Sequence, residues 1–227
     1  MATRNSTEPQ SKRAYDYLRD MIAKRAWPAG ERLSIRWVSQ RLGVSVTPVT
    51  AAVEQLEREG LLFVAPRSGT TIRPLGHDDI QQIFGLRRMI EIYAARIAVE
   101  LAPDSAIDEA KACVAALANC IDRNHYRQDK IDDWMASDYR LHEIFVENCG
   151  NPLILETYRT YNVHLHIVRN FQVRALSNSD HGQKEHERIV KAFEQRDAEA
   201  LVDVIDQHLS EACYEILRVV ATTGVGI

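Results

Sequence analysis

The sequence lacks the features of a membrane protein and of a disulfide-stabilised protein. No apolar run approaches the roughly 18 residues that a membrane-spanning helix needs, and no apolar stretch near the N-terminus resembles a signal peptide. The four cysteines form no C-x-x-C pair, which argues against a disulfide frame or a thiolate zinc site. They are best interpreted as small buried residues in a reducing compartment. These absences predict a soluble, cytoplasmic protein with no membrane partner.

The charge is divided unevenly along the chain. At 227 residues the chain exceeds the commonest size of a single domain, so two domains of unequal length are expected. Residues 1–75 hold 12 Lys and Arg against 7 Asp and Glu, a net charge of +5. The remaining residues hold 16 against 25, a net charge of −9. A basic small domain followed by an acidic larger one predicts that only the first contacts a polyanion.

The basic part, residues 1–75, is predicted to begin with a tail that is followed by helices. Residues 1–10 are polar and aperiodic, which predicts a disordered tail, and a helical pattern follows Ser11 until the turn at residues 27–30. Ser34 is a good N-cap for a second helix, which Gly43 would end.

A third helix and a hairpin complete this part. Thr47 can cap the helix with Pro48 at its first position. The β-prone runs Leu61–Ala65 and Thr70–Arg73, joined by residues 66–69, predict a hairpin. This order is typical of a winged helix-turn-helix over residues 11–75, whose third helix can enter a DNA major groove about 12 Å wide.

Four polar residues in the acidic part form a candidate metal site. Asp138 and His142 are four apart, so they leave the same face of a helix about one turn apart. His186 and His208 lie in two further amphipathic stretches, so three helices can point one carboxylate and three imidazoles at a common centre. Taken singly, each histidine is more often an ordinary surface or capped residue. The set predicts about one divalent metal per chain, with zinc the first candidate and nickel, manganese or iron as alternatives.

Both parts of the chain contain segments that resemble a known family. The segment GERLSIRWVSQRLGVSVTPVTAAVEQLEREGLL, followed by PRSGTTI, is similar to the DNA-binding domain of GntR-type bacterial regulators. The segments LRRMIEIYAARIA, DYRLHEIFVENCGNPLI and EHERIVKAFEQRDAEALVDVIDQHL resemble the all-helical, metal-binding FCD effector domain of the FadR subfamily.

The resemblance has consequences for fold and site. It implies a mainly α protein: a winged helix-turn-helix, then an all-helical domain over residues 78–222 that binds effector and metal. About six helices are expected there, at 78–101, 104–122, 130–148, 151–173, 182–195 and 197–220. The family's metal-ligand positions fall on Asp138, His142, His186 and His208.

The predicted recognition turn departs from the family pattern. The usual turn carries two arginines that approach DNA, where this chain has Val46 and Thr50. Losing two such arginines should change the operator sequence and weaken anchoring to phosphates. Val46 could instead touch a thymine methyl, and Thr50 could bond a base or a phosphate, with plain solvent exposure as the alternative. The predicted DNA-binding residues are Arg36, Ser45, Val46, Thr47, Thr50, Arg67 and Gly69.

An arginine completes the predicted effector site. Arg87 and Glu91 are one helical turn apart and could be a solvated pair, but the resemblance turns Arg87 inward, where it would clamp a carboxylate beside the metal. His164, His166 and Arg169 could line the same cavity, although His164 and His166 cannot both face inward.

The predicted function is transcriptional regulation without enzymatic activity. A homodimer would bind double-stranded operator DNA, and a small organic acid bound at the metal site would control its affinity. Two alternatives stay open, a metal-dependent hydrolase or lyase and a helical protein with structural zinc. Against the enzyme, the only acid adjacent to His142, Glu143, should point off the metal-facing side.

Overall fold

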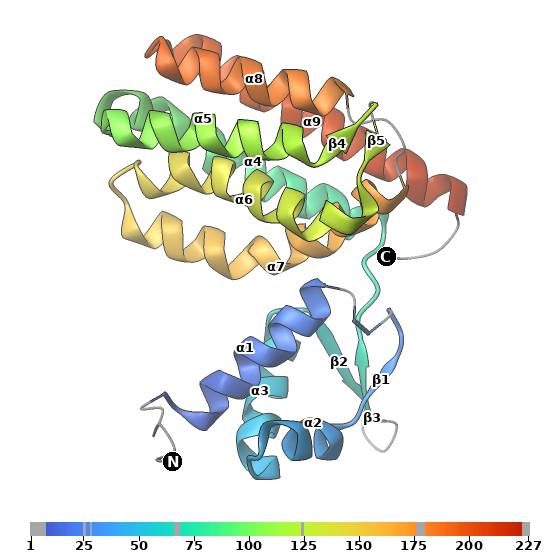
Figure 1. Ribbon diagram of the computed structural model, residues 1–227. Coiled ribbons are helices and arrows are strands. Elements are labelled where there is room, and N and C mark those ends of the chain that lie inside the picture. The colour runs from blue at the N-terminus through green and yellow to red at the C-terminus, as the bar shows by residue number, and fades with distance from the viewer. Residues whose placement is uncertain are drawn as a thin grey trace. The chain divides into compact units, whose positions relative to one another are not determined.

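The computed structural model describes residues 8–24, 26–27, 29–65, 69–123, 125–175 and 180–223, and these are mainly helical (Figure 1). The chain divides into two compact units, with the boundary between Pro74 and Leu75. Within the described residues, no helix is both long and apolar enough to cross a membrane.

The first unit is a winged helix-turn-helix. Its elements are α1 (Gln10–Ala23), β1 (Arg32–Leu33), α2 (Ile35–Leu42), α3 (Val46–Arg58), β2 (Leu62–Ala65) and β3 (Gly69–Ile72). The strands form an antiparallel sheet in the order β1-β3-β2. Helix α1 packs against α3, and their contact buries apolar side chains such as Leu18, Val53 and Leu56.

Local sequence determines where α2 begins and ends. The Ser34 hydroxyl accepts a hydrogen bond from the Trp37 backbone N–H at 3.2 Å, which satisfies one of the free donors of the first turn. Gly43 ends the helix in the left-handed conformation, with φ of 64°, which glycine adopts without steric cost. Both predicted boundaries of this helix are therefore confirmed.

Other boundaries in this unit differ from the prediction. Helix α3 begins at Val46 after Ser45, so Thr47 is the second helical residue and not the cap. Helix α1 begins at Gln10, one residue before Ser11. Strand β1 could not be predicted from the sequence, because a two-residue strand has no measurable period and depends on its pairing with β3.

The second unit is a helical bundle with one short hairpin. Its elements are α4 (His77–Leu101), α5 (Asp104–Asn119), β4 (Ile121–Asp122), β5 (His125–Tyr126), a 3-10 turn η1 (Gln128–Lys130), α6 (Ile131–Glu147), α7 (Pro152–Ala175), α8 (Asp180–Glu194) and α9 (Ala198–Thr223). The six expected helices are all present within the described residues. The predicted 104–122 helix is too long, however, since α5 ends at Asn119 and the β4–β5 hairpin follows.

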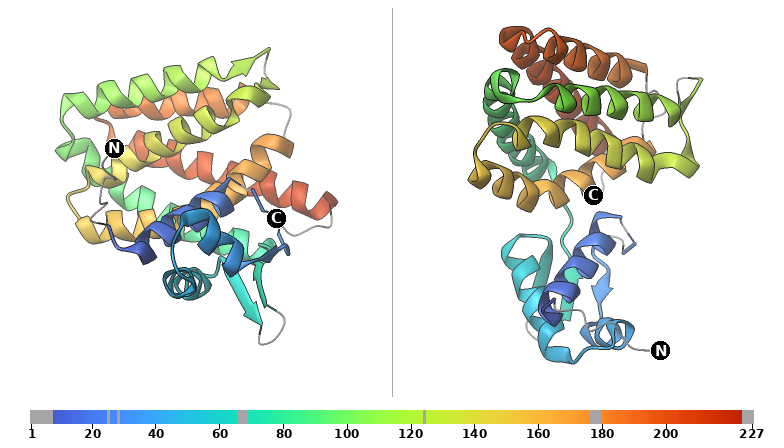
Figure 2. Two further views of the ribbon diagram at one scale, coloured as in Figure 1. Left: turned by 60° about the horizontal axis from the view of Figure 1, so that its bottom comes forward. Right: turned by 60° about the vertical axis from the view of Figure 1, so that its left-hand side comes forward.

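The packing of this bundle places α6, α8 and α9 around one interior. Helix α9 packs along α4 and α8, while α6 packs against α4, α5 and α7. Both views of Figure 2 show α5 and α6 side by side. The core contains Leu141, Phe145, Phe193 and Leu209, all at 0% exposure. The faces that carry Asp138, His142, His186 and His208 therefore lie among tightly packed apolar side chains.

Candidate metal centre and DNA-binding surface

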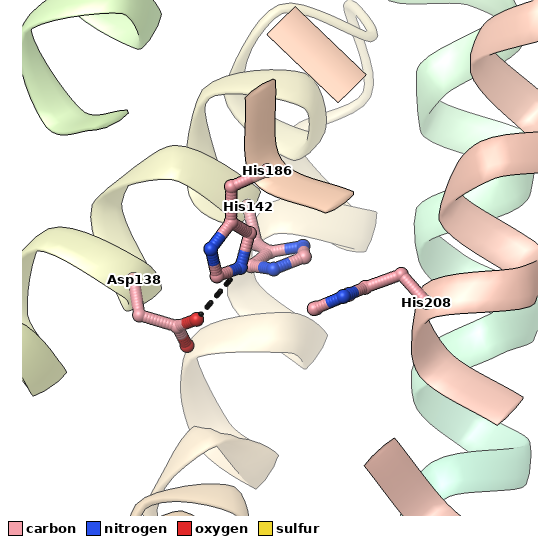
Figure 3. Close-up of side chains that lie close together, drawn as sticks. All are labelled: Asp138, His142, His186 and His208. Atoms are coloured by element: carbon pink, nitrogen blue, oxygen red, sulfur yellow. Dashed lines mark ion pairs between the residues drawn. The ribbon is translucent and has the colours of Figure 1, made fainter. Parts of the chain in front are cut away.

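The four predicted metal ligands meet inside the bundle. Asp138 and His142 come from successive turns of α6, His186 from α8 and His208 from α9, and the four side chains point toward one another (Figure 3). All four are buried, and one ligand atom from each lies within 4.8 Å of the others. His186 Nε2 is 3.1 Å from Asp138 Oδ1.

The donor set fits a divalent transition metal. Three imidazoles and one carboxylate are ligands that zinc, nickel, manganese and iron all accept. Among the described atoms, Nε2 of His142 and Nδ1 of His186 are buried and have no hydrogen-bond partner. A buried polar atom without a partner costs about 1–3 kcal/mol, so a site that leaves Nε2 of His142 in this state is better explained by a ligand.

Two glutamates orient two of the three imidazoles by hydrogen bonding to their Nδ1 atoms. His142 Nδ1 donates to Glu91 Oε2 at 2.7 Å, and His208 Nδ1 donates to Glu185 Oε2 at 2.9 Å. These bonds place the proton on Nδ1 and direct Nε2 of each ring away from the glutamate. Carboxylates of this kind typically hold metal-binding histidines in position. Sequence reasoning missed Glu185, which has no signal beyond its place beside His186.

Glu91 also joins this site to Arg87. Its Oε1 accepts hydrogen bonds from Arg87 Nε at 2.5 Å and from the Tyr158 hydroxyl at 3.0 Å. Burial acts to raise the pKa of Glu91, but the Arg87 guanidinium and the His142 imidazole outweigh burial and hold the pKa at about 2. Burial, and then the charge of Arg87, lower the pKa of His142 despite Glu91. Glu91 is therefore ionised and His142 neutral at neutral pH.

The outer edge of the Arg87 guanidinium is the next feature of the site. The side chain is buried, and Nη1 and Nη2 have no hydrogen-bond partner among the described residues. Burial lowers the pKa of Arg87, but the charges of Glu91 and, among others, Asp138 raise it more, so the guanidinium stays charged. A charged, forked donor thus sits within the electrostatic reach of the Asp138 carboxylate. This arrangement suits a carboxylate that accepts two parallel hydrogen bonds.

The remaining polar candidates of the bundle are Glu143, His164, His166 and Arg169. Glu143 is buried but bonded to Tyr139, Arg140 and Arg159, on a side of α6 away from His142, in agreement with the expectation. His164 is buried in α7. The side chains of His166 and Arg169 lie outside the described residues.

Most of the predicted DNA-binding residues are exposed on the first unit. Arg36 is the second residue of α2, Ser45 precedes α3, and Val46 and Thr47 are the first two residues of α3. All four are exposed. Thr50 is half-buried, and its hydroxyl donates to the Val46 carbonyl at 3.1 Å. Gly69, at the start of β3, is exposed, whereas Arg67 lies outside the described residues.

Comparisons with known proteins agree with this architecture. Residues 10–72 match the family model of bacterial regulatory proteins of the gntR family, and residues 82–211 match the FCD domain. The HTH-type transcriptional repressor RspR of Escherichia coli is 24% identical over 215 residues, which cover 95% of this chain and 92% of RspR. The solved structure of E. coli McbR/YncC superposes with a TM-score of 0.79 at 16% identity, over 93% of this chain and 99% of that one. The metal-free FCD domain of TM0439 matches with a TM-score of 0.54 at 19% identity, over 65% of this chain and 98% of that domain.

These matches identify the class of protein. The chain is a DNA-binding transcriptional regulator with a winged helix-turn-helix and an FCD effector domain. It belongs to the GntR family of bacterial regulators, and its matched families and relatives are transcriptional regulators and not enzymes.

Proposed function

We propose that this regulator senses a small organic acid at a metal site in its FCD domain, and that the acid controls its affinity for operator DNA. One observation carries the proposal: among the described residues the Nη atoms of buried Arg87 have no hydrogen-bond partner, and Asp138, which belongs to a buried cluster of three imidazoles and a carboxylate, acts electrostatically on this guanidinium. Asp138, His142, His186 and His208 would hold about one divalent metal per chain, with zinc the first candidate. When bound, the metal would supply a Lewis-acidic position for a carboxylate oxygen of the effector.

The chain's own residues would select and orient that effector. Arg87 offers two parallel donors to a carboxylate, and its bond to Glu91 fixes the plane of the guanidinium. Glu91 and Glu185 hold the rings of His142 and His208 in fixed orientations. Burial of the whole group excludes water, which strengthens each of these interactions.

The DNA half of the proposal uses the exposed surface of the first unit. Arg36, Ser45, Val46, Thr47, Thr50 and Gly69, with Arg67 of the wing, would contact a pseudo-palindromic operator. A homodimer would read its two half-sites, which lie one DNA turn of about 34–36 Å apart. Both the FCD match and the basic charge of residues 1–75 support this division of roles.

Two other functions make different demands on the site. A metal-dependent hydrolase or lyase needs a general base beside the metal, and Glu143 is instead bonded to Arg140 and Arg159. A structural zinc bundle needs only the four ligands and has no use for a buried arginine whose Nη donors find no partner in the part of the chain that the structure describes. Arg87 therefore discriminates between a sensor and a structural zinc protein.

The metal is tested by elemental analysis of the purified protein. We expect about one divalent metal per chain in the wild type and almost none in the His186→Ala, His208→Ala double variant, because two of the four ligands are lost. His125→Ala is the matched control, since His125 is exposed and lies on β5. Equal metal content in the double variant and the wild type would exclude this site.

The effector is tested by a thermal-shift screen of mono- and dicarboxylates on the metal-loaded protein, followed by calorimetry. Arg87→Lys keeps a positive charge beside Glu91 but removes the planar fork, so it should weaken a true effector at least tenfold. Arg88→Lys is the control, because Arg88 is exposed and paired with Asp206. A structural zinc protein would give no acid whose affinity depends on both the metal and Arg87.

A further inference from the structure

The outward face of α3 carries methyl groups where DNA-reading helices commonly carry cations. The buried face consists of Val49, Ala52, Val53 and Leu56. On the opposite face Val46 is 47% exposed, Thr47 and Ala51 are exposed and Thr50 is half-buried. The first two turns of α3 therefore offer an outer surface that carries a methyl group on each of these four residues and no charged side chain.

The polar groups of this face are limited. The Thr50 hydroxyl already donates to the Val46 carbonyl, so its methyl group and its acceptor lone pairs are left for a partner. The only cation in α3 is Arg58, in the last turn, twelve residues or about 18 Å along the axis from Val46. The face therefore has no long donor that could make a bidentate bond to guanine.

The position of α3 within the fold indicates that its outward face meets the major groove of DNA. Helices α2 and α3 form the helix-turn-helix, and the second helix of this motif enters the major groove with its N-terminal residues against the base edges. Exposed Arg36 and Arg41 of α2 supply positive charge for phosphates, which position a protein without reading sequence. Base recognition then falls to the N-terminal turns of α3.

We propose that Val46 and Thr50 determine operator specificity by packing against the 5-methyl groups of thymines in the major groove. The thymine methyl is the one apolar group that distinguishes base pairs there, and aliphatic side chains are its usual partners. The inference rests on the DNA-binding function and specifies the chemistry of the site that DNA must present. Each half-site would have thymine at the base pairs facing these two residues.

The test begins with selection of bound duplexes from a random pool by the full-length protein. Each thymine of the selected site is then replaced by uracil, which removes only the methyl group. Loss of one buried methyl should weaken binding about fourfold at the contacted positions. Uracil placed outside the selected site should have no effect.

Variants then assign the contacts to residues. In Val46→Ser the uracil effect should disappear at one position, because the partner of that methyl is gone, while Val46→Thr should retain part of it. Thr50→Arg should move the selected base toward guanine. Arg36→Ala should weaken thymine and uracil duplexes equally. Melting temperatures check that each variant is folded, and the uracil series on the wild type requires no variant.

The outcomes separate two kinds of failure. Sequence-selective binding that is insensitive to uracil, or a selected site without thymine opposite α3, would overturn methyl readout alone. A folded protein that selects no duplex at all would overturn the proposed DNA-contacting surface as well. Loss of affinity at one or two uracil positions, abolished by Val46→Ser, is the result that supports the proposal.

Discussion

Glu91 hydrogen-bonds to three buried polar groups, so its replacement would affect each of these partners. It accepts hydrogen bonds from Arg87 and Tyr158 and orients His142. Among the described residues, the Glu91 carboxylate is the negative charge bonded to the buried guanidinium of Arg87. A neutral side chain at residue 91 would leave that buried cation without the carboxylate bonded to it.

Glu91→Gln should therefore destabilise the metal-free protein by about 3–5 kcal/mol, the usual cost of breaking a buried ion pair from one side. Urea denaturation in the presence of a chelator measures this. Glu109→Gln is the control, since Glu109 pairs with Arg140 at a more exposed position and should cost no more than about 1 kcal/mol. Similar losses in the two variants would show that Glu91 does not compensate Arg87.

His142 gives the metal-free protein a pH dependence of known sign. Burial and the Arg87 charge lower the pKa of its imidazole below the ordinary 6.5, although Glu91 opposes them. The unfolded chain therefore takes up a proton that the folded protein excludes. The contribution of His142 to stability is fully present above pH 6.5 and decreases as the pH falls toward the lowered pKa, by at most about 1.4 kcal/mol per pH unit.

Denaturation curves between about pH 7.5 and about pH 5, measured with a chelator present, test this sign because the range brackets the ordinary imidazole pKa of about 6.5. His142→Asn should flatten the slope, whereas His125→Asn, at an exposed position, should leave it as in the wild type. A wild-type protein that becomes more stable as the pH falls through this range would contradict the assignment.

At the scale of elements, two exposed glycines should respond oppositely to the same substitution. Gly43 ends α2 with φ of 64°, a conformation that a Cβ disfavours, so Gly43→Ala should destabilise by about 1 kcal/mol. Gly85 lies within α4, and an added Cβ would meet nothing within 4 Å, so Gly85→Ala should stabilise by about 0.5–1 kcal/mol. Thermal melting of both variants beside the wild type gives the two signs, and a shift of the same sign in both would contradict this account.

The elements also show what a sequence can predict. Long amphipathic helices such as α6 and α9 are readable because their apolar period repeats over many turns. The short strands β1, β4 and β5 are not, since two residues carry no period and their structure comes from pairing partners. The same limit applies to the site. Spacing and resemblance indicated Asp138 and His142, whereas the contacts of Tyr158 and Glu185 depend on how separate helices pack.

At the scale of the whole molecule, the predicted DNA-binding residues and the proposed effector site belong to separate units. The predicted DNA-binding residues precede Pro74, and the four metal-ligand candidates and Arg87 follow it. An acid bound in the second unit can regulate the first only if it binds one state of the protein more tightly than another. Any such coupling must act in both directions, because it is a difference in free energy between the same four species.

Acid and operator should therefore change each other's affinity by the same factor. If saturating acid weakens operator binding tenfold, saturating operator must weaken acid binding tenfold, a coupling of about 1.4 kcal/mol. Titration calorimetry of the acid with and without operator, and DNA titrations with and without acid, measure the two sides at one fixed salt concentration, because counterion release makes DNA affinity steeply salt-dependent. Arg87→Lys should reduce acid affinity while the unliganded variant binds operator as the wild type does, and Arg88→Lys should alter neither titration. An acid that binds with an affinity indifferent to operator would be a ligand of the FCD domain but not the regulator's effector.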